Sequence, residues 1–258
     1  MATADLHWQH KTRDLDGVSR NLDFIIACLA LVVLSPLMLL IALGIVVESG
    51  RPVLFSQLRL GQYGRPFRIH KFRKFHKECG TTGTAVCPDD DKRLTALGKL
   101  LRLTKLDELP QLWNVLRGDM SIVGPRPETL AFADSFTAGF ERVLEHKPGI
   151  FGPTQVMFRN EGSLYPSDVD PSEFYRAVLF PNKARIDLAY YEQRTIRSDI
   201  AWFFRGVLAT LGWVPSTLLR PEELLACDHE AESTSLTALT ASCAEVIEGP
   251  PRHQRSKA

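Results

Sequence analysis

Residues 24–47 read FIIACLALVVLSPLMLLIALGIVV, twenty-four consecutive positions without a charge. About 20 apolar residues cover the hydrocarbon core of a bilayer, so this run predicts a membrane helix. A signal peptide fits poorly, because the run is long, starts late and is followed by Glu48-Ser49-Gly50-Arg51 instead of a small-residue cleavage site. The segment therefore predicts a protein inserted in a membrane.

A proline divides this apolar run near its middle. Pro36 removes one helical hydrogen bond and crowds the preceding turn, so the helix must kink or break there. Each arm of about eleven residues is roughly 17 Å long, about half of the bilayer core. Two structures are open: a kinked span, or a re-entrant hairpin that enters and leaves on one face. Ser35 could hydrogen-bond a carbonyl that the break frees.

The charges on either side of the run favour the hairpin. Lys11, Arg13 and Arg20 precede it, and residues 51–77 hold eight Lys or Arg and no Asp or Glu. Basic residues mark the cytoplasmic side of a membrane, whereas acidic residues count for little. Bases on both flanks therefore predict that both ends are cytoplasmic. An ordinary kinked span is the alternative.

The rest of the chain predicts an α+β, mostly helical fold with a small β-hairpin. Short apolar stretches at 52–60 and 66–71, separated by Gly61 and Gly64, read as the hairpin. Leu spacing predicts a helix over 93–103. A second helix is expected from Asp107, as N-cap, to 117, with Gly118 as its stop.

Further along, residues 129–146 and 172–198 look mostly helical. The stretch 201–219 has a single charge, Arg205, and two tryptophans, which favour the membrane–water boundary. It is expected to be an interfacial amphipathic helix, with a buried helix as the alternative. Residues 79–91 form a loop whose three consecutive Asp suit a solvated turn better than a divalent ion.

Composition adds a domain plan and excludes some site classes. We expect a flank at 1–23, the re-entrant helix at 24–47, a folded domain at 48–220, and a variable tail at 221–258. That tail has seven acids and three bases among many Ser, Thr and Ala, a composition typical of loosely ordered segments. The five cysteines are scattered and odd in number, which disfavours a zinc site or a disulfide framework. A reducing setting fits the folded domain.

The candidate chemistry begins at two adjacent carboxylates, Asp107 and Glu108. They could divide the work, because a carboxylate can attack phosphorus to form an acyl phosphate while its neighbour positions a metal or a proton. The alternative is purely structural. An Asp at a helix N-cap followed by a first-turn Glu is favoured by the helix dipole, so the pair alone proves nothing.

Basic residues near this pair could hold an anion. In Gly124-Pro125-Arg126-Pro127 two prolines fix the backbone around one guanidinium, which grips phosphate through paired donors. A plain structural turn is the alternative. Lys71, Arg73 and Arg102 add positive charge, and the basic stretch 51–77 also suits anionic lipid headgroups. Nucleic acid is not expected as a partner, since the net charge is only +1 and a membrane segment is present.

Several motifs together resemble the bacterial sugar transferases, the monotopic phosphoglycosyl transferases that act on polyprenyl phosphate, in their short form. The resemblance covers roughly residues 18–215, with order and approximate spacing retained. The motifs are DELPQLWNVL at 107–116, GDMS at 118–121, VGPRP at 123–127, SP at 35–36, KFR at 71–73, DKRLT at 91–95, PGI at 148–150, QV at 155–156 and RN at 159–160.

The resemblance implies an enzyme and gives its residues roles. Asp107 would take a sugar 1-phosphate from a UDP-sugar and release UMP, and undecaprenyl phosphate would then accept the phosphosugar, starting glycan or polysaccharide assembly. Glu108 would help to hold Mg²⁺, which offsets the charge of the diphosphate. Arg126, beside Pro127, and Arg159 would bind phosphate.

The same resemblance makes Arg102, Lys71 and Arg73 second-rank phosphate ligands and makes Ser35-Pro36 the re-entrant turn. It implies a catalytic domain at 48–220 on the cytoplasmic face of the bacterial inner membrane, with membrane lipids as partners. A homodimer stays open.

The sequence also departs from the family pattern near the presumed substrate. Lys105 stands where Ser is usual, Phe151 replaces Thr, and Pro153-Thr154 replaces Leu-Trp; Met157-Phe158 and 161–183 are unusual too. These changes leave the sugar undetermined. Two other classes stay open: a non-catalytic membrane adaptor, which would not need the carboxylates and arginines together, and a glycosyltransferase, which would release a nucleoside diphosphate.

Overall fold

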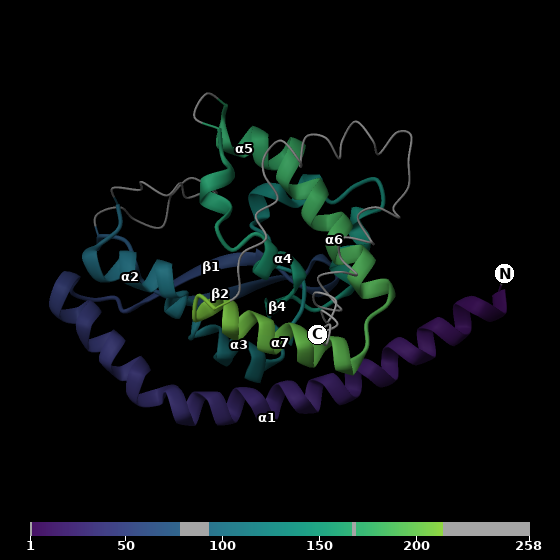
Figure 1. Ribbon diagram of the computed structural model, residues 1–258, viewed down its shortest axis with the longest axis horizontal. Helices are drawn as coiled ribbons and strands as arrows, with labels where there is room; N and C mark the ends of the chain where they lie inside the picture. Colours follow the sequence, from purple (N-terminus) through teal and green to yellow (C-terminus); the bar gives the residue numbers. More distant parts are fainter. Residues whose placement is uncertain (1, 78–92, 167–168, 214–258) are drawn as a thin grey trace, which may run out of the picture. The chain divides into compact units, whose positions relative to one another are not determined.

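The computed structural model describes residues 2–77, 93–166 and 169–213 (Figure 1). The expected loop at 79–91 and the tail at 221–258 lie outside these residues. The helices are α1 (Ala2–Ser49), α2 (Ala96–Thr104), α3 (Gln111–Arg117), α4 (Pro153–Met157), α5 (Pro171–Phe174), α6 (Phe180–Glu192) and α7 (Ile196–Thr210). The strands are β1 (Leu54–Leu60), β2 (Pro66–Phe72), β3 (Ser121–Val123) and β4 (Gly149–Phe151).

Short tight turns join these elements. The 3-10 turns are η1 (Gln62–Gly64), η3 (Leu106–Glu108), η4 (Leu130–Ser135), η5 (Phe140–Glu145) and η6 (Glu161–Leu164), and η7 (Tyr175–Leu179) is a π-helical turn. The mostly helical α+β prediction is therefore confirmed. Over 129–146 the expected helix is instead the two turns η4 and η5, separated by Ala138 and Gly139, both at positive φ. A helix cannot run through such a pair.

Two small sheets organise the strands. The predicted hairpin is confirmed: β1 and β2 pair antiparallel, with Leu54 opposite Phe72 and Leu60 opposite Pro66. A second, parallel pair joins β3 to β4 and was not predicted, because three-residue strands leave no periodic pattern. Here a Cβ on Gly149 would lie 2.0 Å from the nitrogen of Gly124, so the close approach of the two backbones requires glycine.

The apolar N-terminal segment is one continuous helix. Pro36 lies inside α1, which curves beneath the rest of the described fold in Figure 1. The Ser35 hydroxyl donates to the Val32 carbonyl at 2.8 Å, the acceptor that the missing N–H of Pro36 leaves free. The predicted hydrogen bond of Ser35 is thus confirmed. The chain does not fold back at Pro36, so the re-entrant hairpin is not confirmed.

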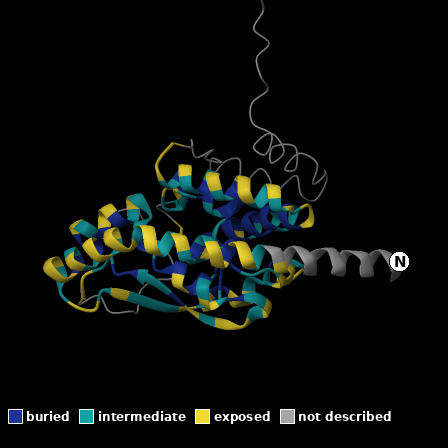
Figure 2. Ribbon diagram, turned by 90° about the horizontal axis from the view of Figure 1, so that it is seen from below, coloured by how far each residue is buried: buried dark blue, intermediate teal, exposed yellow. Residues whose placement is uncertain are grey.

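One side of α1 packs against the domain and the rest is exposed. Ala27, Ile41 and Ile45 are buried, whereas twelve large apolar side chains of α1 are exposed, and exposed positions recur along the helices in Figure 2. Residues Ser19–Ser49 are long and apolar enough to cross a bilayer. Such a surface fits lipid better than water.

Polar contacts hold both ends of this apolar stretch to the same domain. At its start the Arg20 guanidinium donates to carbonyls at the end of α3, and Asp23 accepts from the Ser121 hydroxyl and the Ile122 N–H. At its end the Arg73 guanidinium donates to the carbonyls of Ser49 and Gly50. The helix therefore lies along the domain instead of leading away from it.

The segment around Asp107 differs from the expected helix. The predicted helix at 93–103 is confirmed as α2, which ends at Lys105 in the left-handed region with φ 58°. Asp107 does not cap a helix; it lies in η3, and α3 begins only after Pro110. The reason is that the Asp107 carboxylate accepts from Lys74 and not from the backbone of the next turn. The predicted stop at Gly118 is confirmed, with φ 87°.

Beyond residue 170 the expected helix over 172–198 is confirmed in broad terms but divided. It consists of α5, η7 and α6, followed by a break at 193–195 and the start of α7. The Thr195 hydroxyl begins α7 by accepting from the Ser198 N–H. Helix α7 is amphipathic, because Trp202 is buried while Phe204 and Trp213, just past the helix, are exposed. Its place at a membrane interface stays a prediction, and 214–219 of the expected stretch lie outside the described residues.

Candidate active site

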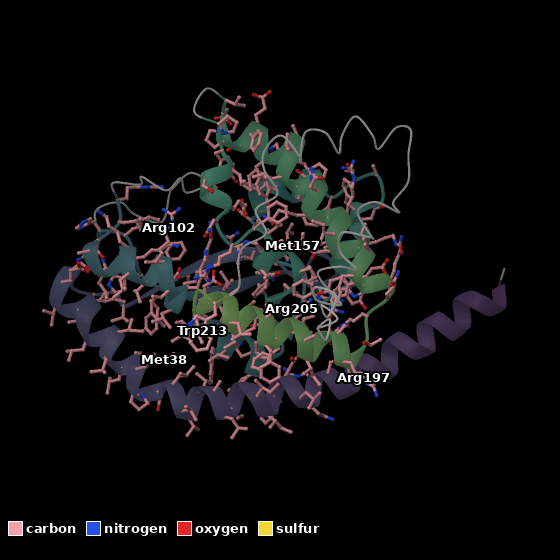
Figure 3. All side chains as sticks on the ribbon, in the orientation of Figure 1. Met38, Arg102, Met157, Arg197, Arg205 and Trp213 are labelled. Carbon is pink, nitrogen blue, oxygen red and sulfur yellow. The ribbon has the colours of Figure 1, made fainter. Side chains whose placement is uncertain are left out.

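A cavity of about 1070 Å³ lies among β1, β2, α2, η3, η6 and α7. One part of its wall is apolar and includes Ile26, Ala30 and Leu34 of α1. The remainder carries ten Lys or Arg and four Asp or Glu, so the cavity has an excess of positive charge. The basic residues are Arg59, Lys71, Lys74, Arg93, Lys99, Arg102, Lys105, Arg126, Arg159 and Lys183. Figure 3 shows Arg102 on α2 facing this region.

Asp107 is the most enclosed carboxylate of the cavity wall. Its residue is only 1% exposed, and its Oδ2 accepts from the Lys74 ammonium at 3.1 Å. Its Oδ1 is buried without a hydrogen-bond partner among the residues that the structure describes. A buried carboxylate oxygen with no donor is costly and unusual, so this atom is a candidate for contact with a ligand or metal.

Glu108 lies beside it and is held by the hairpin. The Lys71 ammonium of β2 donates to Glu108 Oε1 at 2.6 Å. Burial alone would raise the pKa of Glu108, but Lys71, Arg126 and Lys105 outweigh it and hold that pKa well below its usual range. Burial in turn lowers the pKa of Lys71 to about 8. Glu108 is therefore an anion at neutral pH, available as an oxygen ligand.

Two lysines at the C-terminal end of β2 thus form ion pairs with the two carboxylates. Lys71 lies in β2 and Lys74 lies two residues beyond its end, so the antiparallel hairpin presents both to η3. Lys105, at the position where the family pattern has Ser, also lines the cavity, and burial lowers its pKa. Positive charge therefore surrounds the pair, which suits a highly anionic ligand.

Arg126 reaches the cavity from the loop 124–127. Burial would lower its pKa, but Glu108, Glu161 and Glu128 raise it above its usual value, so the guanidinium stays charged. Arg159 lines the cavity from the turn after α4, and its guanidinium donates to the carbonyls of Leu103 at 2.9 Å and Thr210 at 3.4 Å.

The structure brings together most of the predicted site residues, but not all of them. Asp107, Glu108, Lys71, Arg102, Arg126 and Arg159 all line the cavity. Arg73 does not: its side chain is buried against the end of α1, where it binds carbonyls. Pro127 is not among the lining residues either, and its carbonyl accepts from Arg59. Ser35 and Pro36 lie in α1 and are not among the lining residues, although the adjacent Leu34 is.

Sequence reasoning missed a polar network on the same wall, which we call the Glu128–Glu161 network. The Tyr175 hydroxyl donates to Glu128 Oε1 at 2.5 Å, and the Tyr165 hydroxyl donates to Glu161 Oε1 at 2.8 Å. The Lys183 ammonium donates to Glu161 Oε2 at 2.9 Å and to the Tyr175 hydroxyl at 3.2 Å. Two of its members directly follow motifs in the sequence: Glu128 follows GPRP, and Glu161 follows RN at 159–160.

Lys74 was also missed, although it directly follows the predicted Arg73. The pattern KFRK offers three cations in four positions, and which of them face the cavity depends on how the strand ends. Lys71 and Lys74 turn toward η3, while Arg73 turns toward α1. A sequence cannot separate these directions where the strand gives way to loop.

Comparison with known proteins bears on what this site does. The family described as bacterial sugar transferase matches residues 15–212, which is most of the chain. The chain belongs to this family. The chain is 35% identical over 197 residues, or 75% of its length, to the UDP-N-acetylgalactosamine-undecaprenyl-phosphate N-acetylgalactosaminephosphotransferase of Aeromonas hydrophila.

Two further relatives carry another sugar in their names. Both are UDP-glucose:undecaprenyl-phosphate glucose-1-phosphate transferases. The one from Caulobacter vibrioides is 44% identical over 55% of this chain, and the one from Escherichia coli K12 is 41% identical over 75% of it. The matched stretches cover 44%, 54% and 41% of the Aeromonas, Caulobacter and Escherichia proteins. The chain thus spans about half of the length of these relatives.

The carboxylate oxygens of Asp107 and Glu108 also suit a magnesium ion as ligands. Mg²⁺ prefers one or two carboxylates combined with substrate phosphate oxygens and water. Asp107 Oδ1 lacks a donor among the described residues, and Glu108 is an anion beside it. No group of three or more His, Cys, Asp or Glu that could hold a metal occurs in the described part of the chain. A site completed by substrate oxygens is the kind that these residues could form.

Proposed function

We propose that this protein transfers a sugar 1-phosphate from a UDP-sugar to undecaprenyl phosphate. The observation that carries the proposal is the buried Asp107, with one oxygen unpartnered in the described structure, beside the anionic Glu108 in a cavity rich in Lys and Arg. A carboxylate needs such surroundings to approach an anionic diphosphate. The names of the relatives supply the two substrate classes.

The reaction proceeds in two displacements at one phosphorus. A carboxylate oxygen of Asp107 attacks the phosphorus that bears the sugar; the bond to the bridging oxygen breaks, and UMP leaves with the electron pair. A phosphate oxygen of undecaprenyl phosphate then attacks the same phosphorus. The bond to Asp107 breaks, which restores the carboxylate and yields undecaprenyl diphosphosugar. No proton transfer is required in either displacement.

The surrounding cations stabilise the charge that shifts during these steps. Arg126 and Arg159 hold phosphate oxygens, with Arg102 and Lys71 in support. Lys74 fixes the orientation of Asp107 through its 3.1 Å ion pair. Glu108, with Asp107 Oδ1, would hold Mg²⁺, which when bound supplies charge neutralisation at the diphosphate.

Membrane insertion places this chemistry where both substrates can meet. Both ends of the apolar part of α1 are tied to the same domain, through Arg20 and Asp23 at one end and Arg73 at the other. A helix that crossed the bilayer would carry its ends to opposite faces. The contacts therefore support a monotopic protein whose α1 has both flanks on the cytoplasmic face of the inner membrane, with Ser35-Pro36 as the proposed re-entrant turn and lipids around the exposed side of the helix. A homodimer remains a separate hypothesis.

The identity of the released nucleotide tests the reaction. Purified protein would be incubated with a panel of UDP-sugars, Mg²⁺ and undecaprenyl phosphate, and the nucleotide products separated by ion-exchange chromatography. We expect UMP, and its release should stop when EDTA removes the metal. Release of UDP would instead show a glycosyltransferase, and no release from any sugar would favour a non-catalytic adaptor.

A further inference from the structure

We propose that the Glu128–Glu161 network is the subsite for the transferred sugar, and that it selects a neutral hexose or acetamidohexose over a uronic acid. The inference rests on the proposed function and names the part of the substrate that this wall of the cavity receives. All five members, Glu128, Glu161, Tyr165, Tyr175 and Lys183, line the cavity that contains Asp107.

The network is built rigidly enough to discriminate between ligands. Tyr175 and Lys183 are 3% and 5% exposed, and Lys183 lies within 2.9 Å of Glu161 and 3.8 Å of Glu128. Phe132 stacks on Tyr175 with ring centroids 4.3 Å apart. Side chains that are held by several contacts each can fix the positions of hydroxyl acceptors closely.

The charge of the network differs from that of the rest of the cavity. Two carboxylates, one ammonium and two tyrosine hydroxyls give it a net negative charge, whereas the wall around Asp107 is rich in Lys and Arg. A phosphate therefore binds near Arg126 and is repelled here. Each carboxylate has about four lone-pair sites. The hydrogen bonds that Glu128 accepts from Tyr175, and Glu161 from Tyr165 and Lys183, leave acceptor capacity for hydroxyl donors.

Position along the substrate favours the sugar over the uracil or the ribose. Arg126 interacts electrostatically with Glu108 beside the nucleophile and with Glu161 and Glu128 of the network, so the network adjoins the phosphate held by Arg126. The sugar is bonded directly to the phosphorus that Asp107 attacks, while the nucleoside lies one phosphate further away. Uracil also offers a single N–H donor and two carbonyl oxygens, which two carboxylates would not attract.

The test compares nucleotide sugars that differ only in the sugar. Wild type, Glu161→Gln and Tyr165→Phe would be assayed with UDP-glucose, UDP-galactose, their N-acetylamino counterparts and UDP-glucuronic acid. Binding of each, and of UMP, would be measured by calorimetry on the same proteins. Tyr190→Phe is the matched control, because Tyr190 of α6 donates to Asp199 of α7 and does not line the cavity.

We expect Glu161→Gln to weaken binding of the best neutral UDP-sugar about tenfold or more, since a hydrogen bond to a charged group is lost. It should narrow the preference over UDP-glucuronic acid, while UMP affinity stays within about threefold of wild type. Tyr165→Phe keeps the carboxylate and serves as the second variant if Glu161→Gln fails to fold; it should also weaken binding of the neutral UDP-sugar and narrow the preference over UDP-glucuronic acid. Tyr190→Phe should leave the ranking unchanged.

Two results would overturn the subsite: an equal loss of affinity for UMP and for the UDP-sugars, or an unchanged sugar ranking in both variants. The binding data separate this proposal from the reaction. A protein that releases no UMP but loses sugar affinity on Glu161→Gln has the subsite without the proposed chemistry. One that releases UMP with unaltered sugar affinity has the chemistry without the subsite.

Discussion

At the scale of single residues, the function depends on groups that are buried at a cost. Asp107 is buried with one oxygen unpartnered in the described structure, and Lys71 is buried with its pKa lowered to about 8. A protein selected for stability alone would not keep such residues, because unpaired or desolvated polar groups oppose folding. Their presence in one cavity favours a functional site over the alternative that Asp107 and Glu108 only stabilise the start of a helix.

Replacing Asp107 by Asn should lower turnover by at least about a thousandfold, because an amide cannot serve as the nucleophile. The fold should persist, since the amide retains the shape of the carboxylate. Mass spectrometry of wild type mixed with a UDP-sugar alone should find a phosphosugar mass on the peptide that contains Asp107. Asp134→Asn, at an exposed carboxylate paired with Arg176, is the control and should retain activity. Full turnover by the Asp107 variant would remove this residue from its role.

Asp187 predicts a dependence of stability on pH. Burial raises its pKa to about 7, against opposing effects of a hydrogen bond from Thr154 and the charge of Lys183, and with a smaller contribution from Glu128 in the same direction as burial. The folded state therefore binds the proton more tightly than the unfolded state, and stability falls as pH rises from about 4 to about 7.

Asp187→Asn removes that titration. Relative to wild type, the variant should gain up to roughly 4 kcal/mol in free energy of unfolding between pH 4 and pH 8, at about 1.4 kcal/mol per pKa unit. Thermal unfolding in detergent at both pH values measures the difference. Asp199→Asn should instead destabilise the protein at pH 8, because it removes the partner of Arg194. A pH-independent difference for Asp187→Asn would refute the assignment.

At the scale of elements, short irregular segments place the site. The β1–β2 hairpin presents Lys71 and Lys74, the turn η3 presents Asp107 and Glu108, and the backbone contact between Gly124 and Gly149 fixes the loop that carries Arg126. The turn η3 has three residues, and each strand of the hairpin has seven. Such segments are stable only through the packing of their neighbours, so the site and the fold are interdependent.

The contact between α1 and α3 belongs to this scale. The Arg20 guanidinium donates to the carbonyls of Val115 and Leu116 at the C-terminal end of α3, where the helix dipole favours a cation. Arg20→Ala should therefore lower the free energy of unfolding by about 1–3 kcal/mol. Arg197→Ala on α7, labelled in Figure 3, is the matched control at an exposed arginine and should change it by less than about 0.5 kcal/mol. Equal effects of the two variants in thermal unfolding would show that the hydrogen bonds from Arg20 to α3 do not stabilise the fold.

At the scale of the whole molecule, the described domain carries both a charged cavity and a helix with an exposed apolar side. Twelve exposed large apolar residues on α1 and several on α7 cannot be satisfied by water alone. The cavity wall includes the apolar side of α1 at Ile26, Ala30 and Leu34 as well as the charged site. A lipid phosphate could therefore reach Asp107 while its chain stays in apolar surroundings.

The proposed re-entrant topology rests on the contacts that both ends of the apolar stretch make with one domain. In a variant without native cysteines, single cysteines introduced as Ala4→Cys and Arg65→Cys should both react with a membrane-impermeant maleimide only after the inner membrane is opened. The reason is that a re-entrant α1 keeps its two flanks on the cytoplasmic side. A periplasmic cysteine in a known membrane protein serves as the positive control. Labelling of Ala4→Cys in intact cells would show that α1 spans the bilayer.

The sequence by itself determined the elements with a local signal. The apolar run, the β-hairpin, the helix at 93–103 and the stop at Gly118 each follow from periodicity or turn chemistry within a few residues. The same holds for Asp107, Glu108 and Arg126, which the motifs marked. Only the tertiary structure decided that Asp107 binds Lys74 instead of capping a helix and that Arg73 serves α1 instead of the cavity. It alone joined Glu128 to Glu161 through Lys183. Those outcomes depend on which distant side chains meet, and an ion pair between residues over thirty positions apart leaves no local pattern in the chain.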